Sequence, residues 1–223
     1  MKKGVFYGIG TGPGDPELIT LKAVRILTEC DVIAVPCASA DKSFAYSVAK
    51  AAVPAVCEKT VLCIDMPMTR DASVRDMAER KGAERIADAL VEGKDVCFVT
   101  IGDPTVYSTY MYLQRRIADM GYECCIISGV TSFCAAAAEL GISLCEGMEQ
   151  LHIIPGAGDE EKKMQGTRVY MKDDIKKILP RLKGSIVQAV ENCGTDRQRI
   201  YRCADDIPDD AGYFTVIIAK EDK

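Results

Sequence analysis

The feature that most constrains the fold is a glycine-rich turn after the first apolar run of the chain. The segment 4–20 reads GVFYGIGTGPGDPELIT, so closely spaced glycines end the apolar run. Glycine tolerates tight turns and close backbone approach. Asp15 is a suitable N-cap, and Pro16 occupies the first helical position, where a missing amide costs nothing. The pattern predicts a strand, a tight turn and a capped helix.

A turn at the carboxyl end of a parallel strand usually faces a ligand crevice. The spacing here differs from a dinucleotide fingerprint, because Gly8, Gly10 and Gly12 follow GxGxG and Pro13 interrupts the amides that would face a phosphate. No acidic residue ends the next apolar run, Val32–Val35. The sequence therefore disfavours a dinucleotide fold, and a turn that holds no ligand stays open as an alternative.

Apolar runs of strand length alternate with helical patterns over the first half of the chain. We expect helices at 18–28, 44–52, 72–91 and 106–120, strands at 32–35, 60–64 and 96–101, and a further strand that Ile126 and Ile127 close. This alternation predicts a parallel sheet with right-handed crossovers. A small-residue helix at 131–140 follows. Closely spaced strands near 151–155, 168–170, 185–191, 199–203 and 213–219, with a helix at 173–182, indicate a second, α+β domain.

Composition excludes several classes of protein. The 223 residues carry a formal charge of −5, whereas nucleic-acid binding depends on a basic face. The longest apolar runs are strand-sized and no charged-then-apolar leader precedes them, so we expect a cytoplasmic protein without a membrane segment. The eleven cysteines include no CxxC pair, and His152 is the single histidine. We expect reduced thiols and no metal site.

Four segments, taken together and in chain order, resemble the tetrapyrrole (corrin and porphyrin) methylases. They are GPGDPELITLKAVRIL near the start, GDPTVYST after the fourth predicted strand, SGVTSFCAAAA at the domain junction and ENCGTDRQ late in the chain. The resemblance spans nearly the whole chain. It implies two α/β domains, 1–128 with a parallel sheet and 129–223 with a mixed sheet. It also implies an active site in the cleft between them, S-adenosylmethionine (SAM) as methyl donor, and a homodimer.

Within this family, PMTRD at 67–71 and YSTYMYL at 107–113 are most similar to enzymes that methylate carbon 20 of precorrin-2 or cobalt-factor II in cobalamin biosynthesis. The resemblance leaves the metal state of the ring open. Methylation at other ring positions, such as carbons 2 and 7 of uroporphyrinogen III in the sirohaem branch, is the alternative. A diphthine synthase is a more distant rival, and a non-catalytic nucleotide-binding module is a rival of another class.

The resemblance also implies site residues. The residues expected at the methyl donor are Pro13, Ile101, Gly102, Asp103, Val106, Thr131, Ser132, Met171 and Thr215. A donor with an ammonium and a sulfonium suits carbonyls and a carboxylate better than a phosphate cradle. An Asp-Pro pair at a strand-to-helix turn is often only a cap, and Asp103 can combine both roles.

The substrate carries many carboxylates, which favours basic side chains around the open end of the cleft. Arg70 is the first candidate because it interrupts an irregular stretch after a strand; a solvating role in that loop is the alternative. Tyr107 and Tyr110 are candidates to line a pocket for the flat macrocycle. Part of the aromatic cluster in YSTYMYL is nevertheless expected to pack in the core. The group that removes the proton is unknown, with Tyr107 and Asp15 as candidates.

Overall fold

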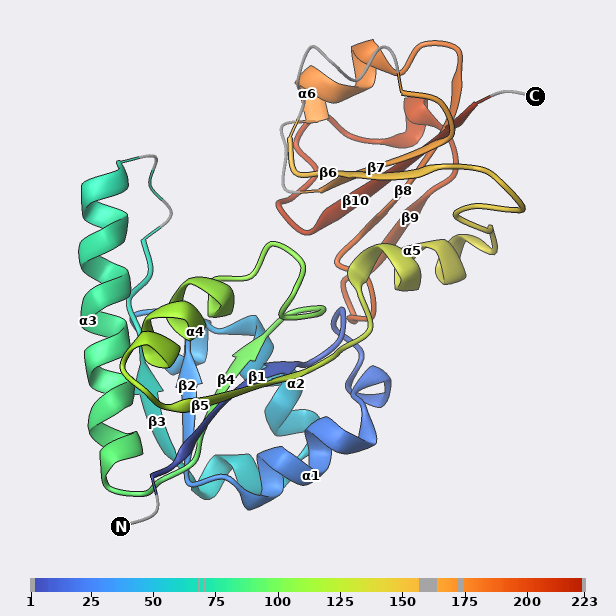
Figure 1. Cartoon of the computed structure of the whole chain (residues 1–223). Helices are drawn as coiled ribbons and strands as arrows, with labels where there is room; N and C mark the ends of the chain where they lie inside the picture. Colours follow the sequence, from blue (N-terminus) through green and yellow to red (C-terminus); the bar gives the residue numbers. More distant parts are fainter. Residues whose placement is uncertain (1–2, 68, 70, 157–163, 172–174, 222–223) are drawn as a thin grey trace. The chain divides into compact units, whose positions relative to one another are not determined.

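The computed structural model describes residues 3–67, 69, 71–156, 164–171 and 175–221. The chain forms two compact units, Met1–Thr131 and Ser132–Lys223, which are described separately below (Figure 1). The sequence predicted a domain boundary after Ser128. In the described residues, no helix combines the length and the apolar character that crossing a membrane requires.

Unit 1 contains a five-stranded parallel sheet in the order β3-β2-β4-β1-β5. Its strands are β1 (Val5–Gly10), β2 (Val32–Val35), β3 (Thr60–Cys63), β4 (Val96–Thr100) and β5 (Glu123–Ile127). Its helices are α1 (Leu21–Glu29), α2 (Phe44–Ala52), α3 (Ala72–Val91) and α4 (Tyr110–Asp119), with short 3-10 turns η1 (Pro16–Leu18), η2 (Ala40–Lys42) and η3 (Pro54–Glu58). The predicted parallel sheet is confirmed.

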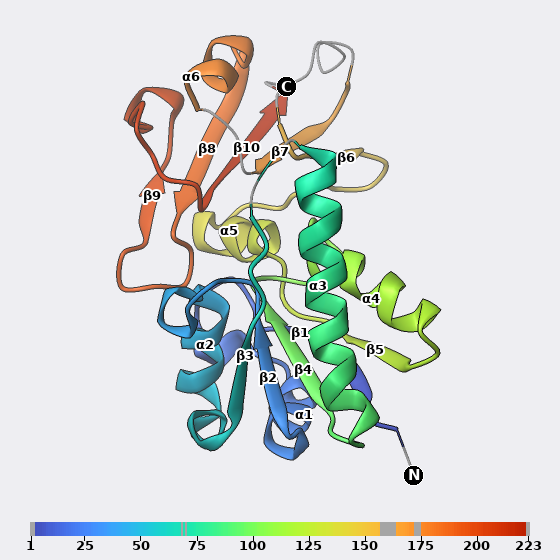
Figure 2. The same cartoon turned by 90° about the vertical axis from the view of Figure 1, so that its left-hand side faces the viewer.

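Helices cover both faces of this sheet, and alternate strand residues point to opposite sides. Ile9, Ile33 and Val99 pack with α1, α2 and η3, whereas Phe6 and Phe98 pack with α3 and α4. Figure 2 shows α3 and α4 side by side in front of the strands. Burial on both faces explains why the strands read as nearly continuous apolar runs.

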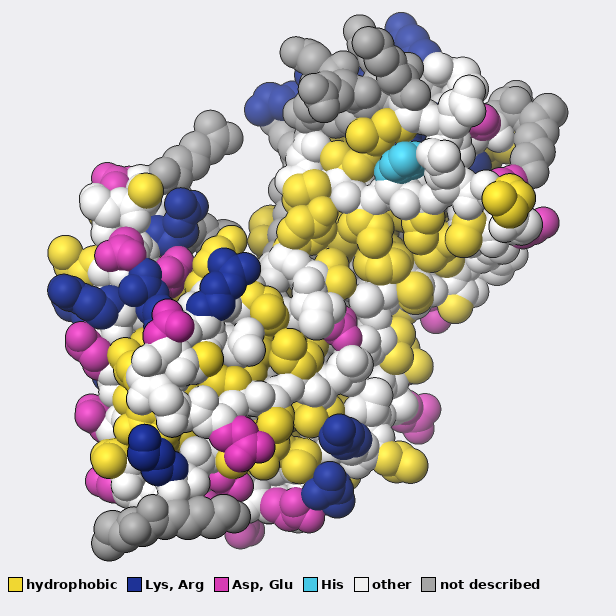
Figure 3. Space-filling model, viewed as in Figure 1, with side chains coloured by type: hydrophobic (Ala, Val, Ile, Leu, Met, Phe, Trp, Pro, Cys, Tyr) yellow, Lys and Arg dark blue, Asp and Glu magenta, His cyan; other side chains and the backbone are white. Residues whose placement is uncertain are grey.

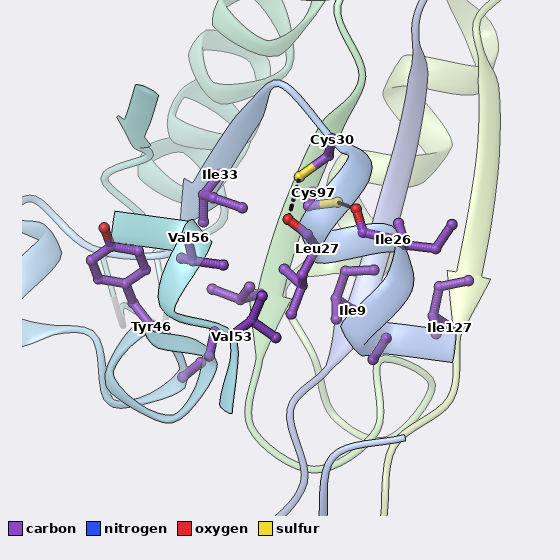
Figure 4. Packing of buried hydrophobic residues seen from close by; sticks show 14 of the residues in the cluster. Ile9, Ile26, Leu27, Cys30, Ile33, Tyr46, Val53, Val56, Cys97 and Ile127 are labelled. Carbon is purple, nitrogen blue, oxygen red and sulfur yellow. Dashed lines mark hydrogen bonds between the residues drawn. The ribbon is translucent and has the colours of Figure 1, made fainter. Parts of the chain in front are cut away.

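Figure 4 shows the core on the α1 and α2 side. Cys30 and Cys97 lie within it, and their thiols donate to the carbonyls of Leu27 and Ile26. All eleven cysteines are free thiols, as the sequence predicted. Burial raises the pKa of the Cys97 thiol well above its usual value, so this residue acts as a small apolar side chain.

Two helix starts differ from the prediction. Asp15 accepts a hydrogen bond from the Glu17 amide, but it caps only η1, and α1 begins later with Thr20 as its own N-cap. The predicted helix from Val106 begins instead at Tyr110 as α4, because Tyr107 has a left-handed backbone with φ +48°. That conformation is incompatible with a continuous right-handed helix.

Unit 2 contains a mixed five-stranded sheet in the order β6-β7-β10-β8-β9. Its strands are β6 (Leu151–Ile154), β7 (Thr167–Met171), β8 (Ser185–Glu191), β9 (Arg199–Tyr201) and β10 (Thr215–Glu221). Its helices are α5 (Ser132–Leu140), α6 (Ile175–Ile178), η5 (Leu179–Arg181) and η6 (Ala204–Asp206). Strands β6 and β7 are parallel and the other pairs antiparallel, so the predicted mixed sheet is confirmed.

Candidate functional site

Three glycines meet where β1, β4 and β5 of unit 1 end. A Cβ atom built on Gly10 would lie 2.6 Å from the Gly102 carbonyl oxygen and 2.7 Å from the Gly129 Cα. A Cβ on Gly129 would lie 2.2 Å from the same oxygen. The obstructing atoms are backbone, which cannot rotate away. The three loops therefore pack backbone against backbone, and glycine is required for this approach.

Hydrogen bonds join the first two of these loops. The Thr11 amide and hydroxyl both donate to the Thr100 carbonyl, at 2.9 and 3.1 Å. The Gly102 amide donates to the Gly12 carbonyl at 2.7 Å, and both glycines have left-handed backbones, with φ +72° and +79°. Pro13 directly follows this bridge. The turns that the sequence singled out near residues 12 and 102 are therefore adjacent in space.

Asp103 joins the second loop to the third. One carboxylate oxygen accepts from the Thr105 amide at 2.8 Å and from the Thr105 hydroxyl, and the other accepts from the Gly129 amide at 3.0 Å. Burial raises the pKa of Asp103, but hydrogen bonds from Thr105, Gly129 and Ser128 outweigh it and hold the pKa below its usual value. Asp103 is thus an ionised, buried anchor of the loop junction, which is more than a local cap.

The other candidates of this loop lie at different depths. Tyr107 is 43% exposed, whereas Ser108 is buried and donates to the Thr100 hydroxyl at 3.1 Å. Ile101 is partly buried and packs against the α1 side of the core. The Val106 amide donates to the Asp103 carbonyl at 3.1 Å. The loop is therefore held from within, and its Tyr107 side chain reaches solvent.

Tyr110, expected to contact substrate, has no exposed surface. Its hydroxyl donates to the Cys125 carbonyl at 3.0 Å, and a Cβ on Gly8 would lie 2.5 Å from its ring. Burial raises the pKa of the Tyr110 hydroxyl far above its usual value. Tyr110 is therefore a core residue that supports β1 from below, and the absent side chain at Gly8 makes room for its ring.

Two further candidates, Asp15 and Arg70, remain. Asp15 is partly exposed, and its carboxylate accepts from the Glu17 amide at 2.8 Å. Arg70 lies outside the described residues.

In unit 2, the sheet register brings two candidates together. Met171 ends β7 and is paired with Val216, the residue after Thr215. Thr215 begins β10 and is paired with Glu191 at the end of β8. The Thr215 hydroxyl donates to the Gly212 carbonyl at 2.7 Å. Met171, Thr215 and the ENCGTDRQ segment therefore share one end of this sheet.

Glu191 is a functional candidate that sequence reasoning missed. Its side chain is buried and accepts from the Tyr201 hydroxyl at 2.8 Å and from the Gly212 amide at 2.7 Å. Burial, followed by the hydrogen bond to Glu191, raises the pKa of Tyr201. The sequence signal is a glutamate that ends an apolar strand and opens the ENCGTDRQ segment, but its hydrogen-bond partners lie on other segments. Glu191 fixes the turn that precedes Thr215.

Thr131 is the last residue of unit 1, and Ser132 is the first residue of α5. The Thr131 hydroxyl is buried and has no hydrogen-bond partner in the described part of the chain. A buried, unpaired hydroxyl costs about 1–3 kcal/mol, so a ligand that supplies a donor or acceptor there is favoured. The ionised Asp103 suits a cationic ligand. These residues fit the ammonium and sulfonium of the expected donor better than a phosphate.

Comparisons with known proteins agree on one family. The profile of the Tetrapyrrole (Corrin/Porphyrin) Methylases matches residues 5–204. A probable cobalt-precorrin-2 C(20)-methyltransferase of Methanocaldococcus jannaschii is 38% identical over 70% of this chain and 66% of its own length. A precorrin-2 C(20)-methyltransferase of Sinorhizobium is 28% identical over 96% of this chain and 94% of its own.

The fold comparison agrees. The crystal structure of the cobalt precorrin-4 methyltransferase CbiF superimposes with a TM-score of 0.75 and 23% identity, covering 97% of this chain and 94% of CbiF.

Proposed function

The chain belongs to the tetrapyrrole methylases, and from this premise we propose that it is a SAM-dependent C-methyltransferase that methylates carbon 20 of precorrin-2 or cobalt-factor II in cobalamin biosynthesis. The observation that carries the proposal is the family match over residues 5–204, together with relatives that are named for this reaction. The PMTRD and YSTYMYL segments favour carbon 20 over other ring positions and over a protein substrate.

In this proposal the methyl donor is held by the loops at the carboxyl ends of β1 and β4, with Pro13, Ile101, Gly102, Asp103 and Val106. Thr131, Ser132, Met171 and Thr215 complete its site. When bound, SAM supplies an electrophilic methyl group on a positively charged sulfur. The buried, ionised Asp103 and the unpaired hydroxyl of Thr131 support a cationic ligand here. Glycines at 10, 102 and 129 keep the three loops in register.

The proposed work of the protein is to orient the reactants and to exclude water. A reduced macrocycle supplies its own nucleophilic carbon, so no strong base is needed before the transfer. Well-held geometry contributes up to roughly 7–11 kcal/mol to lowering such a barrier. Tyr107, exposed at the loop after β4, is the proposed contact for the macrocycle and, with Asp15, a candidate to accept the proton that leaves carbon 20. Arg70 is proposed to bind a substrate carboxylate.

Tyr110 enters the proposal differently from the other candidates. Since its ring is buried beneath β1, we assign it an indirect role, in which it supports the strand that carries the glycine turn. We also propose a homodimer, as the family resemblance implies, and a cytoplasmic location. Analytical ultracentrifugation tests the dimer, and a monomer at micromolar concentration contradicts it.

Two measurements test the reaction. Calorimetry with S-adenosylhomocysteine, NAD and ATP should detect tight binding of the first alone; binding of NAD instead overturns the methylase proposal. Mass spectrometry after incubation with SAM and either precorrin-2 or cobalt-factor II should detect one added methyl group. Two added methyl groups on uroporphyrinogen III would identify the sirohaem branch. Turnover on metal-free and cobalt-loaded rings then identifies the metal state of the substrate.

A further inference from the structure

A groove with a volume of about 290 Å³ runs along one side of α3 in unit 1. Val74, Met77 and Ala78 line it with Lys81 and Arg85, at the spacing of a single helical face. The segment after β3 supplies the opposite wall. Lys81 and Arg85 therefore differ from Arg75 and Arg80 of the same helix, which do not line the groove. Basic and acidic side chains are interspersed on the face of unit 1 that Figure 3 shows.

The lining combines apolar and basic side chains. Val74 and Met77 are 45% and 50% exposed, so apolar surface of α3 is accessible to a ligand in the groove. Among the described lining residues, Lys81 and Arg85 outnumber the acidic Asp65, whereas the whole chain carries a charge of −5. Such a lining is complementary to a short aliphatic arm that ends in a carboxylate.

The groove lies at the ligand-binding edge of the sheet. The N-terminal turns of α3 extend past the carboxyl ends of the strands in both views (Figures 1 and 2). Only β2 separates β3 from β4, so the ends of β3 and β4 are about 10 Å apart. A four-ring macrocycle placed over the loop after β4 can therefore reach the groove with one of its side arms.

Contacts within unit 1 fix the two walls of the groove. Arg116 on α4 donates to Glu79 at 3.1 and 3.2 Å and to Asp76, which ties the N-terminal half of α3 to α4. Gly82 packs against Ile64 closely enough that a Cβ would meet the Ile64 side chain at 2.7 Å. The guanidinium of Arg85 donates to the Cys63 carbonyl, which directs it toward the end of β3.

We propose that this groove binds a carboxylate-bearing side arm of the tetrapyrrole substrate, with Lys81 and Arg85 as the cationic partners of the carboxylate. The proposal rests on the proposed function and adds a specificity site to it. It concerns the macrocycle and not the methyl donor, so the two ligands can be separated by experiment.

The test compares Lys81→Gln, Arg85→Gln and the double variant with wild-type protein. Affinity for cobalt-factor II is measured by absorbance titration, and affinity for S-adenosylhomocysteine by calorimetry. We expect the Kd of the macrocycle to rise about threefold in each single variant and about tenfold in the double variant. The rise should shrink in high salt, because exposed charges are screened. The Kd of S-adenosylhomocysteine should stay unchanged.

Arg80→Gln is the matched control, since it removes the same charge from α3 outside the groove. Arg85→Lys keeps the charge and should retain macrocycle affinity. A double variant that binds cobalt-factor II as Arg80→Gln does, or that loses both ligands equally, overturns the groove proposal while the proposed function stands. Wild-type protein that binds S-adenosylhomocysteine but neither cobalt-factor II nor precorrin-2 overturns both. Glutarate, a free carboxylic acid, serves as a competitor. If millimolar glutarate displaces cobalt-factor II from wild-type protein but not from the double variant, the result supports carboxylate binding in the groove.

Discussion

The strand ends of the two units keep their shape in different ways. In unit 1, three loops touch through Gly10, Gly102 and Gly129, so the backbone itself sets their spacing. In unit 2, a buried side chain, Glu191, bridges Tyr201 and Gly212. The difference teaches that a glycine cluster leaves a visible mark in the sequence, whereas a buried carboxylate with distant partners does not.

The largest effect is expected where backbone meets backbone. In Gly129→Ala, the new Cβ would lie 2.2 Å from the Gly102 oxygen, and the loops must separate. We expect the free energy of unfolding to fall by about 3 kcal/mol and S-adenosylhomocysteine binding to be lost, as urea unfolding and calorimetry can measure. A Gly129→Ala protein with wild-type stability would show that the loops of unit 1 are not held by backbone contact.

Gly141→Ala is the control for this substitution. Gly141 has a left-handed backbone with φ +70° but nothing within 4 Å of its Cβ direction. Its substitution should cost about 1 kcal/mol through backbone strain and leave binding unchanged.

The second prediction concerns the side-chain bridge of unit 2. Glu191→Ala leaves the Tyr201 hydroxyl and the Gly212 amide without their partner, and the turn before Thr215 loosens. We expect a loss of about 2 kcal/mol in urea unfolding and weaker S-adenosylhomocysteine binding. Glu191→Gln keeps one acceptor oxygen and should lose about half as much. If both variants are as stable as wild type, the bridge does not organise this end of the sheet.

The third prediction uses the ionisation of Asp103. Its pKa is lowered on folding, so its stabilisation is complete above the unfolded value of about 3.9 and is lost as the pH falls through the lower folded value. Asp103→Asn should therefore cost about 1.5 kcal/mol at pH 7, and the cost should be smaller near pH 3, below the unfolded pKa.

Urea unfolding at both pH values measures this difference, with the exposed Asp119→Asn as control. If the loss of stability in Asp103→Asn does not change with pH, the negative charge of Asp103 does not stabilise this junction. Calorimetry on the same variant shows whether the loss of cofactor affinity exceeds the loss of stability.

Local patterns were sufficient for much of unit 1. The helices predicted at 44–52 and 72–91 match α2 and α3, because each follows a side-chain N-cap, Ser43 or Asp71, and keeps its pattern to the end. The predicted start of α4 was wrong, because Tyr107 lies inside the predicted helix and has a left-handed backbone. Local propensity does not indicate such a conformation at a tyrosine.

The parts of the site that are built from glycine turns could be predicted from the sequence, whereas its buried side-chain contacts could not. The turns near residues 12 and 102 carry glycines, and their adjacency follows from β1 and β4 being neighbours. Glu191 has no such mark, since its role depends on the register of β8 with β10 and on the position of β9. The burial of Tyr110 was equally hidden, because helical spacing does not say which tyrosine faces the sheet.

The smallest effect is expected for Tyr110→Phe. The ring stays beneath Gly8, and only the hydrogen bonds of the hydroxyl to the Cys125 and Phe6 carbonyls are removed. The free energy of unfolding should therefore fall by about 1 kcal/mol, with unchanged ligand binding. Tyr112→Phe, exposed on the same helix, should change neither. Urea unfolding measures the stability of both variants, and the titrations used for the groove measure their ligand binding. A Tyr110→Phe protein with wild-type stability and weakened cobalt-factor II binding would show that Tyr110 contacts the substrate. The loops that meet at Gly10, Gly102 and Gly129 would then have to separate for ligand to bind.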